Sequence, residues 1–361
     1  MPQKKVESQF KTDSLMRLLE ISIALNSTLD LDKILTYIIQ TAAEVLECEA
    51  VSILLYDPVK SDLFFAASSA SDPIQLSEIP VPLKKSLAGK IFLENTPLIL
   101  NNVEKDPRHF AVAAQHVNFH THSMLGVPMR IQNQGVGVLE ALNKRKGVFT
   151  SADEKILSII ASQAAVAIRN ARQMKELELA YDTTLEGWSN ILDLRDEETE
   201  GHTIRVAKLT IQLANELGIS GEELTHIHHG ALLHDIGKMA IPDRVLLKPG
   251  PLTKDEWEIM RQHPVFAYNF LLPITYLRPA IDIPYCHHEK LDGKGYPRGL
   301  KGSEIPFSAR VFAVVDVWDA LTSNRPYRTA WSKEQTLDYI REKAGTHFDP
   351  RVVEAFLDID Q

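Results

Sequence analysis

Cysteine is nearly absent from this sequence. Only Cys48 and Cys286 occur among 361 residues, and they lie far apart in the chain. Two isolated thiols cannot build a disulfide framework, so the sequence favours a reducing compartment. Cys286 precedes two histidines, which leaves thiolate ligation of a metal open beside the plainer role of a small buried apolar residue.

Long apolar runs and long basic runs are also missing. No apolar stretch approaches the roughly 18 residues of a membrane span, and the first residues lack the apolar stretch of a signal peptide. The formal net charge is -9, and the basic residues are interspersed with acidic ones. We therefore expect a cytoplasmic protein that binds neither a membrane nor a nucleic-acid polymer, but that could hold a small anionic substrate.

The composition that is present is that of a folded globular protein. Hydrophobic residues make up 44% of the chain and charged residues 24%. A chain of 361 residues exceeds the usual size of one hydrophobic core, and about 150 residues per domain predicts two domains.

The first half of the chain predicts a mixed α/β domain. Residues 14–47 have apolar side chains at helical spacing, with a break near Asn26 to Asp30 where polar side chains can cap the next helix. Shorter apolar or alternating runs follow and predict strands of an antiparallel sheet flanked by helices: "AVSILLYD", "LFFAASS", "PLILNN", "SMLGVPMRI" and "VGVLEALNK". This order, together with "LGVPM", "GVGVLEALNK" and "FTSADEKILSIIASQAAVAIRNA", resembles a GAF sensor domain across residues 12–171.

Four histidines gather in one stretch of this domain, at His109, His116, His120 and His122. They favour a polar loop over a pocket or at a dimer surface, with haem or metal ligation as the alternative. The ligand of the GAF domain is unknown from sequence.

A long connecting helix is predicted from Ser151 onward, over residues 152–192, and "TSADE" is its capping sequence. One heptad series comprises Leu157, Ala164, Ala171, Glu178, Leu185 and Leu192, and the other comprises Ile160, Ala167, Met174, Tyr181 and Trp188. This seam favours a parallel homodimer contact through the helix. The alternative is that the stripe packs only onto the two domains of its own chain. Gly187 weakens the prediction of a continuous helix at that point.

The remainder, residues 181–361, predicts an all-α domain. Helical apolar spacing covers "HTIRVAKLTIQLANELG", "GEELTHIHHGALLHDIG", "TKDEWEIMRQHPVFAYNFLL", "FSARVFAVVDVWDALTS" and "SKEQTLDYIREKA".

Polar residues inside these apolar helices predict a metal site. His234 and Asp235 end an apolar helix, and Asp316 interrupts an apolar run, where unpaired polar groups would be costly. Glu198 and His202 are four residues apart, so on a helix they would share a face. The full set of candidate ligands is Glu198, His202, His234, Asp235, His263, His287, His288 and Asp316.

The number and type of these ligands favour more than one metal ion. Adjacent helical residues point about 100° apart, so we expect His287 and His288 to point toward two separate metals. Asp235 has two oxygens and could bridge those metals. Nitrogen and oxygen ligands suit two or three first-row transition metals better than a structural zinc, which would typically use cysteine.

The motifs "LLHDIGK", "HHEKLDGKGYP", "DVWDALTSNRPYR" and "THFDP" closely resemble the HD-GYP family of HD-superfamily phosphohydrolases, over residues 181–361. The resemblance implies a helical HD domain that hydrolyses cyclic di-GMP to pGpG, with further cleavage to GMP left open. The eight candidate residues match the family's metal-ligand positions, and iron, or else manganese, is the implied metal. Glu198 stands where many members have an aromatic residue, which implies a third metal.

The resemblance also implies substrate contacts. Lys238 would bind a phosphate and assist catalysis with Asp235, while Arg325 and Arg328 would bind phosphate or guanine. Tyr296 could stack on a base, and Gly295 would allow close backbone approach; in some members this GYP loop contacts signalling proteins. Three alternatives remain: a cyclic di-GMP receptor with little turnover, a protein-interaction module, and a phosphohydrolase of another nucleotide.

Overall fold

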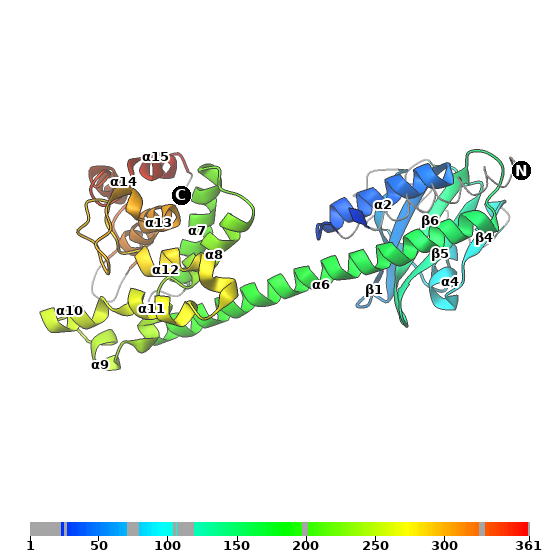
Figure 1. Cartoon of the computed structure of the whole chain (residues 1–361). Helices are drawn as coiled ribbons and strands as arrows, with labels where there is room; N and C mark the ends of the chain where they lie inside the picture. Colours follow the sequence, from blue (N-terminus) through cyan, green and yellow to red (C-terminus); the bar gives the residue numbers. More distant parts are fainter. Residues whose placement is uncertain are drawn as a thin grey trace, which may run out of the picture. The chain divides into compact units, whose positions relative to one another are not determined.

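The computed structural model describes residues 23–24, 27–70, 79–103, 106, 119–196, 201–324 and 329–359. The chain divides into two compact units, residues 1–177 and 178–361 (Figure 1). Within the described residues, no helix combines the length and apolar character needed to cross a membrane.

The first unit is built on a six-stranded antiparallel sheet of order β3-β2-β1-β6-β5-β4. The strands are β1 (Cys48–Asp57), β2 (Asp62–Ser68), β3 (Pro80–Val81), β4 (Leu98–Leu100), β5 (Met124–Ile131) and β6 (Gln134–Lys144). All five predicted strands are present, and β3 was not predicted. The predicted antiparallel α/β fold is confirmed.

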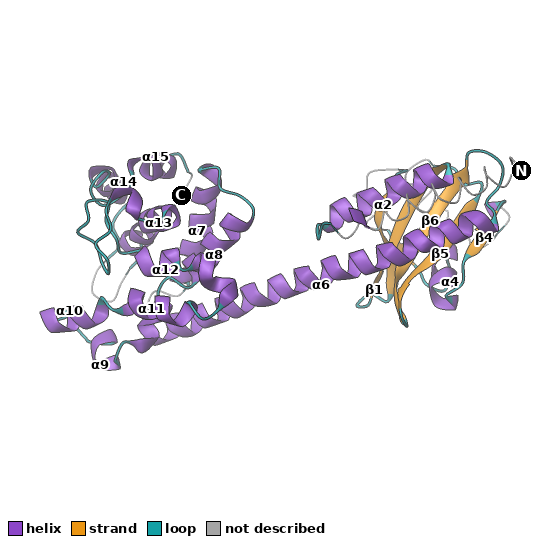
Figure 2. Cartoon of the chain, viewed as in Figure 1, coloured by secondary structure: helices purple, strands orange, loops and turns teal. Residues whose placement is uncertain are grey.

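Helices cover both faces of this sheet (Figure 2). On one face, α2 (Leu31–Leu46) and the first part of α6 (Ser151–Asp196) pack against alternate strand residues such as Leu139 and Ala141. On the other face, α4 (Leu87–Glu94) packs against the intervening residues, including Val138. The predicted break before α2 is confirmed, because the Asp30 side chain accepts hydrogen bonds from the first backbone N–H groups of that helix.

Helix α6 runs without interruption through Gly187, so that glycine does not end it. Its start is capped as predicted, because the Thr150 N–H donates to the Asp153 carboxylate at 2.8 Å.

The two ends of the α6 heptad seam are buried within the chain's own cores. In the first unit the buried seam residues are Leu157, Ile160, Ala164, Ala167 and Ala171, and in the second unit they are Leu185, within the core, and Leu192. The remaining apolar seam residues, Met174, Tyr181 and Trp188, are exposed. Burial at both ends matches the alternative in which the stripe packs onto its own domains, and the homodimer contact stays a prediction.

The second unit is helical, as predicted. Its elements after α6 are α7 (His202–Glu216), α8 (Glu222–Leu232), η2 (Ile236–Ala240), α9 (Asp243–Leu246), α10 (Lys254–Met260), α11 (His263–Leu271), η3 (Thr275–Ala280), α12 (Asp282–Cys286), η4 (Gly302–Glu304), α13 (Phe307–Thr322), α14 (Lys333–Glu342) and α15 (Pro350–Leu357). The core lies around α13, which contacts α7, α12, α14 and α15.

One predicted helix, residues 253–272, is divided into α10 and α11 in the structure. Pro264 lies in the first turn of α11, where its missing N–H costs no hydrogen bond. The prediction of a single helix is wrong here, and the division makes His263 the first residue of α11.

Candidate metal centre

Two groups of candidate ligands converge in the second unit. Asp235, His263, His287 and His288 form one group, and His202, His234 and Asp316 form the other. Within each group, the potential ligand atoms all lie within 4.8 Å of one another. Most of these residues lie at helix ends: His202 begins α7, His263 begins α11, and His287 directly follows α12. Seven of the eight predicted ligands are therefore brought together from separate segments.

A close contact between η2 and α11 brings Asp235 and His263 together. Gly237 in η2 lies so near α11 that a Cβ atom added there would stand 1.9 Å from the carbonyl oxygen of His263. Only glycine permits this approach. The motif "HDIGK" thus requires glycine for packing, two residues after the aspartate.

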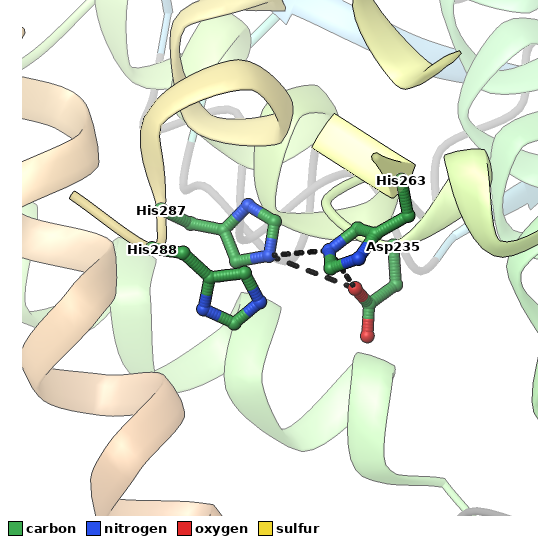
Figure 3. A group of neighbouring side chains, drawn as sticks. All are labelled: Asp235, His263, His287 and His288. Atoms are coloured by element: carbon green, nitrogen blue, oxygen red, sulfur yellow. Dashed lines mark hydrogen bonds and ion pairs between the residues drawn. The ribbon is translucent and has the colours of Figure 1, made fainter. Parts of the chain in front are cut away.

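Asp235 lies between the two groups, with one oxygen toward each (Figure 3 shows the first group). Its Oδ1 lies 3.2 Å from His263 Nε2 and 3.6 Å from His287 Nε2. Its Oδ2 lies 3.1 Å from His234 Nε2. This is the arrangement expected of a carboxylate that bridges two cations.

The tautomers of three histidines follow from their backbone contacts. Nδ1 of His234 donates to the Ala231 carbonyl at 2.9 Å, Nδ1 of His263 to that of Met260 at 2.9 Å, and Nδ1 of His287 to that of Ile283 at 3.1 Å. A carbonyl oxygen can only accept, so each Nδ1 carries a hydrogen. In each neutral ring, Nε2 is then a bare lone pair.

These lone pairs point at one another. Nε2 of His263 and Nε2 of His287 are 3.4 Å apart, and both rings are buried. His234 Nε2 and Asp235 Oδ1 are buried without a well-oriented hydrogen-bond partner, although nitrogen and oxygen atoms lie close by. Buried lone pairs facing each other are unfavourable unless a cation lies between them. The residues therefore fit a metal centre, and their nitrogen and oxygen donors suit first-row transition metals.

The electrostatics of the site favour neutral imidazoles at His287 and His288. Burial lowers the pKa of His288 well below its ordinary value, and it lowers that of His287 as well. Burial alone would also lower the pKa of His234, but the neighbouring Asp235 and Asp316 outweigh it and raise that pKa to about 9. Lys238 and His234 hold the pKa of Asp235 well below its ordinary value against the effect of burial. A bound metal would compete with the proton on His234.

Lys238 lies beside the metal centre. Its Nζ is 2.7 Å from Asp235 Oδ2 and 2.9 Å from Asp196 Oδ2. Its side chain is only 12% exposed, so Lys238 is not a solvent-exposed surface lysine. Asp196, at the last position of α6, was not a candidate from sequence, because one acidic residue at a helix end carries no recognisable pattern.

Three predicted site residues, Glu198, Arg325 and Arg328, lie outside the described residues. The helical argument that joined Glu198 to His202 needs correction. Helix α7 begins at His202, and the preceding Gly201 has a φ of 72°, which is left-handed backbone. A single helix therefore does not carry both positions, and the spacing of four residues says nothing about a shared face.

The expected divergence of His287 and His288 is also not observed. Their ring centroids are 4.0 Å apart, and a nitrogen of each belongs to the same group of potential ligands (Figure 3). His287 keeps helical backbone dihedrals as the C-cap of α12, so the rotation of about 100° between adjacent residues does not prevent both rings from reaching one group.

The loop that follows these histidines is anchored by Glu289. Its buried carboxylate accepts backbone N–H groups from Arg298 at 2.7 Å, Gly299 at 3.1 Å and Leu300 at 3.0 Å. Gly295 lies against the same residue, since a Cβ there would be 2.4 Å from the Cα of Glu289. Sequence reasoning missed Glu289, although a glutamate directly after two candidate ligands was a signal.

Tyr296 lies against a candidate ligand. Its ring centroid is 4.7 Å from that of His288, and the guanidinium of Arg261 lies 5.4 Å from the ring. Burial raises the pKa of the Tyr296 phenol, which therefore stays protonated. In this structure the ring contacts His288 and Arg261, and it stays a prediction that it also meets a base.

Cys286 and the four histidines of the first unit were the other candidates for metal ligation. Cys286 is a buried free thiol beside Ile305 and Ala309, and burial raises its pKa to about 12, which matches the role of a small apolar residue. In the first unit, His109 and His116 lie outside the described residues. His120 and His122 have ring centroids 4.9 Å apart, and among the described residues they belong to no group of three potential metal ligands.

Comparison with known proteins identifies both units. A GAF domain model matches residues 28–169, and an HD domain model matches residues 186–352. A cyclic di-GMP phosphodiesterase response regulator of Xanthomonas campestris is 43% identical over 186 residues, which are 51% of this chain and 49% of the relative. A cyclic di-GMP phosphodiesterase of Thermotoga maritima is 45% identical over 181 residues, 49% of each chain.

A third relative has a different substrate in its name. A 3'3'-cGAMP-specific phosphodiesterase of Vibrio cholerae is 36% identical over 208 residues, 57% of this chain and 40% of the relative. The chain thus spans about half the length, or less, of these relatives. The two models and the relatives agree with the predicted order of domains: the chain carries a GAF domain followed by an HD domain.

Proposed function

We propose that this protein is a metal-dependent phosphodiesterase that hydrolyses cyclic di-GMP to pGpG. The observation that carries the proposal is the convergence of imidazole Nε2 atoms around the two oxygens of Asp235. The similarity of residues 186–352 to HD-domain phosphodiesterases supports the substrate class. The chromatographic assay described below also detects GMP as a further product.

The proposed cofactor is two or three transition-metal ions, iron or else manganese. His202, His234 and Asp316 would hold one ion, and His263, His287 and His288 the other, with Asp235 shared between them. Glu198 would serve a third ion. When bound, such metals supply Lewis acidity toward phosphate oxygens and lower the pKa of a water nucleophile.

The protein's own residues would bind and orient the substrate. The Lys238 ammonium, held beside Asp235, is placed to offset charge that develops on the phosphate. Arg325 and Arg328 would bind phosphate or guanine through their planar guanidinium groups. Gly295 and Tyr296 would shape the loop beside the phosphate that is cleaved.

A second candidate substrate is 3'3'-cGAMP, which one relative is named for. It shares the phosphodiester chemistry with cyclic di-GMP and differs in one base, so the metal centre alone cannot discriminate between the two. A receptor with little turnover and a protein-interaction module are less favoured, because neither role requires seven convergent metal ligands.

The decisive experiment compares substrates and metals in one assay. The full chain is loaded with Fe²⁺ or Mn²⁺ without oxygen and incubated with cyclic di-GMP or with 3'3'-cGAMP, and the products are separated by chromatography. We expect pGpG from cyclic di-GMP, and no product from Asp235→Ala. Asp338→Asn, in an exposed ion pair on α14, is the matched control and should keep full activity. Binding of cyclic di-GMP without product under both metals would refute the hydrolase.

We further propose that the GAF domain regulates this activity through a homodimer formed along α6, in the cytoplasm. The seam residues Met174 and Trp188 are exposed, and Tyr181 is exposed although its ring also stacks on Tyr276 of the same chain. Met174→Glu should then produce a monomer by sedimentation, whereas Leu179→Glu, exposed but outside the seam, should not. A wild-type chain that sediments as a monomer at micromolar concentration would refute the dimer.

A further inference from the structure

Asp319 is a nearly buried carboxylate one helical turn after the candidate ligand Asp316, on α13. Its Oδ2 lies 2.6 Å from Nδ1 of His202. Arg205 donates two hydrogen bonds to the same carboxylate, from Nε to Oδ1 at 2.9 Å and from Nη2 to Oδ2 at 3.0 Å. Both oxygens are thus turned toward protein partners, so Asp319 is not itself placed as a metal ligand.

His202 is held differently from the other histidines of the centre. His234, His263 and His287 donate Nδ1–H to backbone carbonyls of their own segments. Among the described ligands, His202 is the one whose Nδ1 meets a carboxylate. A carboxylate partner places the hydrogen on Nδ1, directs Nε2 toward the metal, and makes that Nε2 a stronger donor than a carbonyl partner does.

His202 is the first residue of α7 and directly follows Gly201, whose backbone is left-handed. Asp319 supplies the acceptor from another helix, and Arg205, one turn further along α7, fixes its orientation through a two-nitrogen fork.

We propose that Asp319, held by Arg205, is the positioning residue of His202 and thereby sets the metal affinity of the position formed by His202, His234 and Asp316. The inference rests on the proposed metal centre and goes beyond it. The other position, around His263, His287 and His288, has no part in this contact. Loss of the Asp319 carboxylate should therefore empty one metal position and leave the other loaded.

The test measures metal binding rather than activity. Metal-free full-length wild type and Asp319→Asn are titrated with Mn²⁺, and bound and free Mn²⁺ are separated by their paramagnetic resonance signals. Wild type should bind two equivalents of Mn²⁺, either both tightly or one more tightly than the other. Asp319→Asn should lose about 10–100-fold in affinity at one equivalent and retain the other. Arg205→Lys, which keeps the charge but loses the fork, should lose less at the same equivalent.

A double-variant comparison separates positioning from a general structural role. His202→Ala and the double variant His202→Ala/Asp319→Asn should bind Mn²⁺ equally, because Asp319 acts through a ring that is already gone. Asp338→Asn serves as the surface control and should match wild type. Should Asp319→Asn not fold, wild-type Mn²⁺ binding by Arg205→Lys would overturn the proposal.

The outcomes distinguish the two levels of inference. Wild-type Mn²⁺ affinity at both positions in Asp319→Asn overturns the role of Asp319 and leaves the metal centre intact. A further loss of affinity in the double variant, beyond that of His202→Ala, also overturns it. Absence of Mn²⁺ and Fe²⁺ binding by the wild type would instead refute the proposed function itself.

Discussion

Gly237→Ala offers a sharp test of how the fold builds the metal centre. The added Cβ would lie 1.9 Å from the His263 carbonyl oxygen and 2.7 Å from the Ala267 backbone nitrogen. Side-chain Cβ atoms essentially never approach another atom within 3.0 Å, so η2 and α11 would have to separate by about 1.1 Å, the difference between 3.0 Å and 1.9 Å. Both neighbours are backbone atoms of a helix and cannot rotate away.

This displacement is large for a metal centre. Metal–ligand distances tolerate about 0.2 Å, and a misplacement of about 1 Å can cost on the order of 100-fold in rate. Asp235, two residues before Gly237, would move relative to His263, whose Nε2 now lies 3.2 Å from its Oδ1. We expect Gly237→Ala to lose metal affinity and at least about 100-fold in activity. Overpacking should also cost about 1–3 kcal/mol in the free energy of unfolding.

The assay combines elemental analysis of bound metal, thermal denaturation and product chromatography. Gly187→Ala is the matched control, because no atom lies within 4 Å of a Cβ at that position of α6. It should keep metal and activity, and it should stabilise the helix by about 0.5–1 kcal/mol. Wild-type metal content and activity in Gly237→Ala would refute the argument from close approach.

Three further predictions follow from other parts of the structure. Glu289→Gln should lower the free energy of unfolding by about 1.5–3 kcal/mol in urea denaturation, since one amide oxygen replaces a carboxylate that accepts three N–H groups; an unchanged midpoint would contradict this. Mn²⁺ at 100 times its dissociation constant should stabilise the metal-free protein by about 2.7 kcal/mol in calorimetry, and a comparable shift in His287→Ala would count against that ligand. Burial raises the pKa of Glu140 from 4.5 to about 7. The folded protein therefore holds the proton more tightly than the unfolded chain, and the contribution of Glu140 to the free energy of unfolding is largest below pH 4.5. It falls by an amount on the order of 3 kcal/mol as the pH rises to about 7. Glu140→Gln should remove that pH dependence from the calorimetric transition of the first unit, and a persistent slope between pH 5 and 7 would show that another group causes it.

Most elements of the fold were predictable because their signals are local. Strand alternation, helical apolar spacing and the caps at Asp30 and Thr150 each depend on a few neighbouring residues. The structure contains the corresponding strands, helices and caps at the expected positions. The missed strand β3 has two residues, too few to show a period. The prediction of one helix over 253–272 failed because the apolar spacing continues through Pro264, whereas a proline is disfavoured inside a helix and here lies in the first turn of a new one.

The composition of the candidate site was also predictable, but its geometry was not. A buried histidine or aspartate inside an apolar run is visible in sequence, as at His234 and Asp316. The direction of each ring was not predictable: Gly201 separates His202 from a helix shared with Glu198, and the rings of His287 and His288 lie together although divergence was expected.

The order of the two domains and the kinds of atoms that could bind a metal follow from sequence, because residue type and local spacing carry that information. The sequence does not reveal that Lys238 lies between Asp235 and Asp196, that Glu289 anchors a loop, or that Asp319 contacts His202. Lys238 is 42 positions from Asp196, and His202 is 117 positions from Asp319. The Glu289 contacts span only 9 to 11 positions, but they require the loop to fold back on itself. These contacts depend on how distant segments pack and how loops fold, and no local pattern of residue types records that.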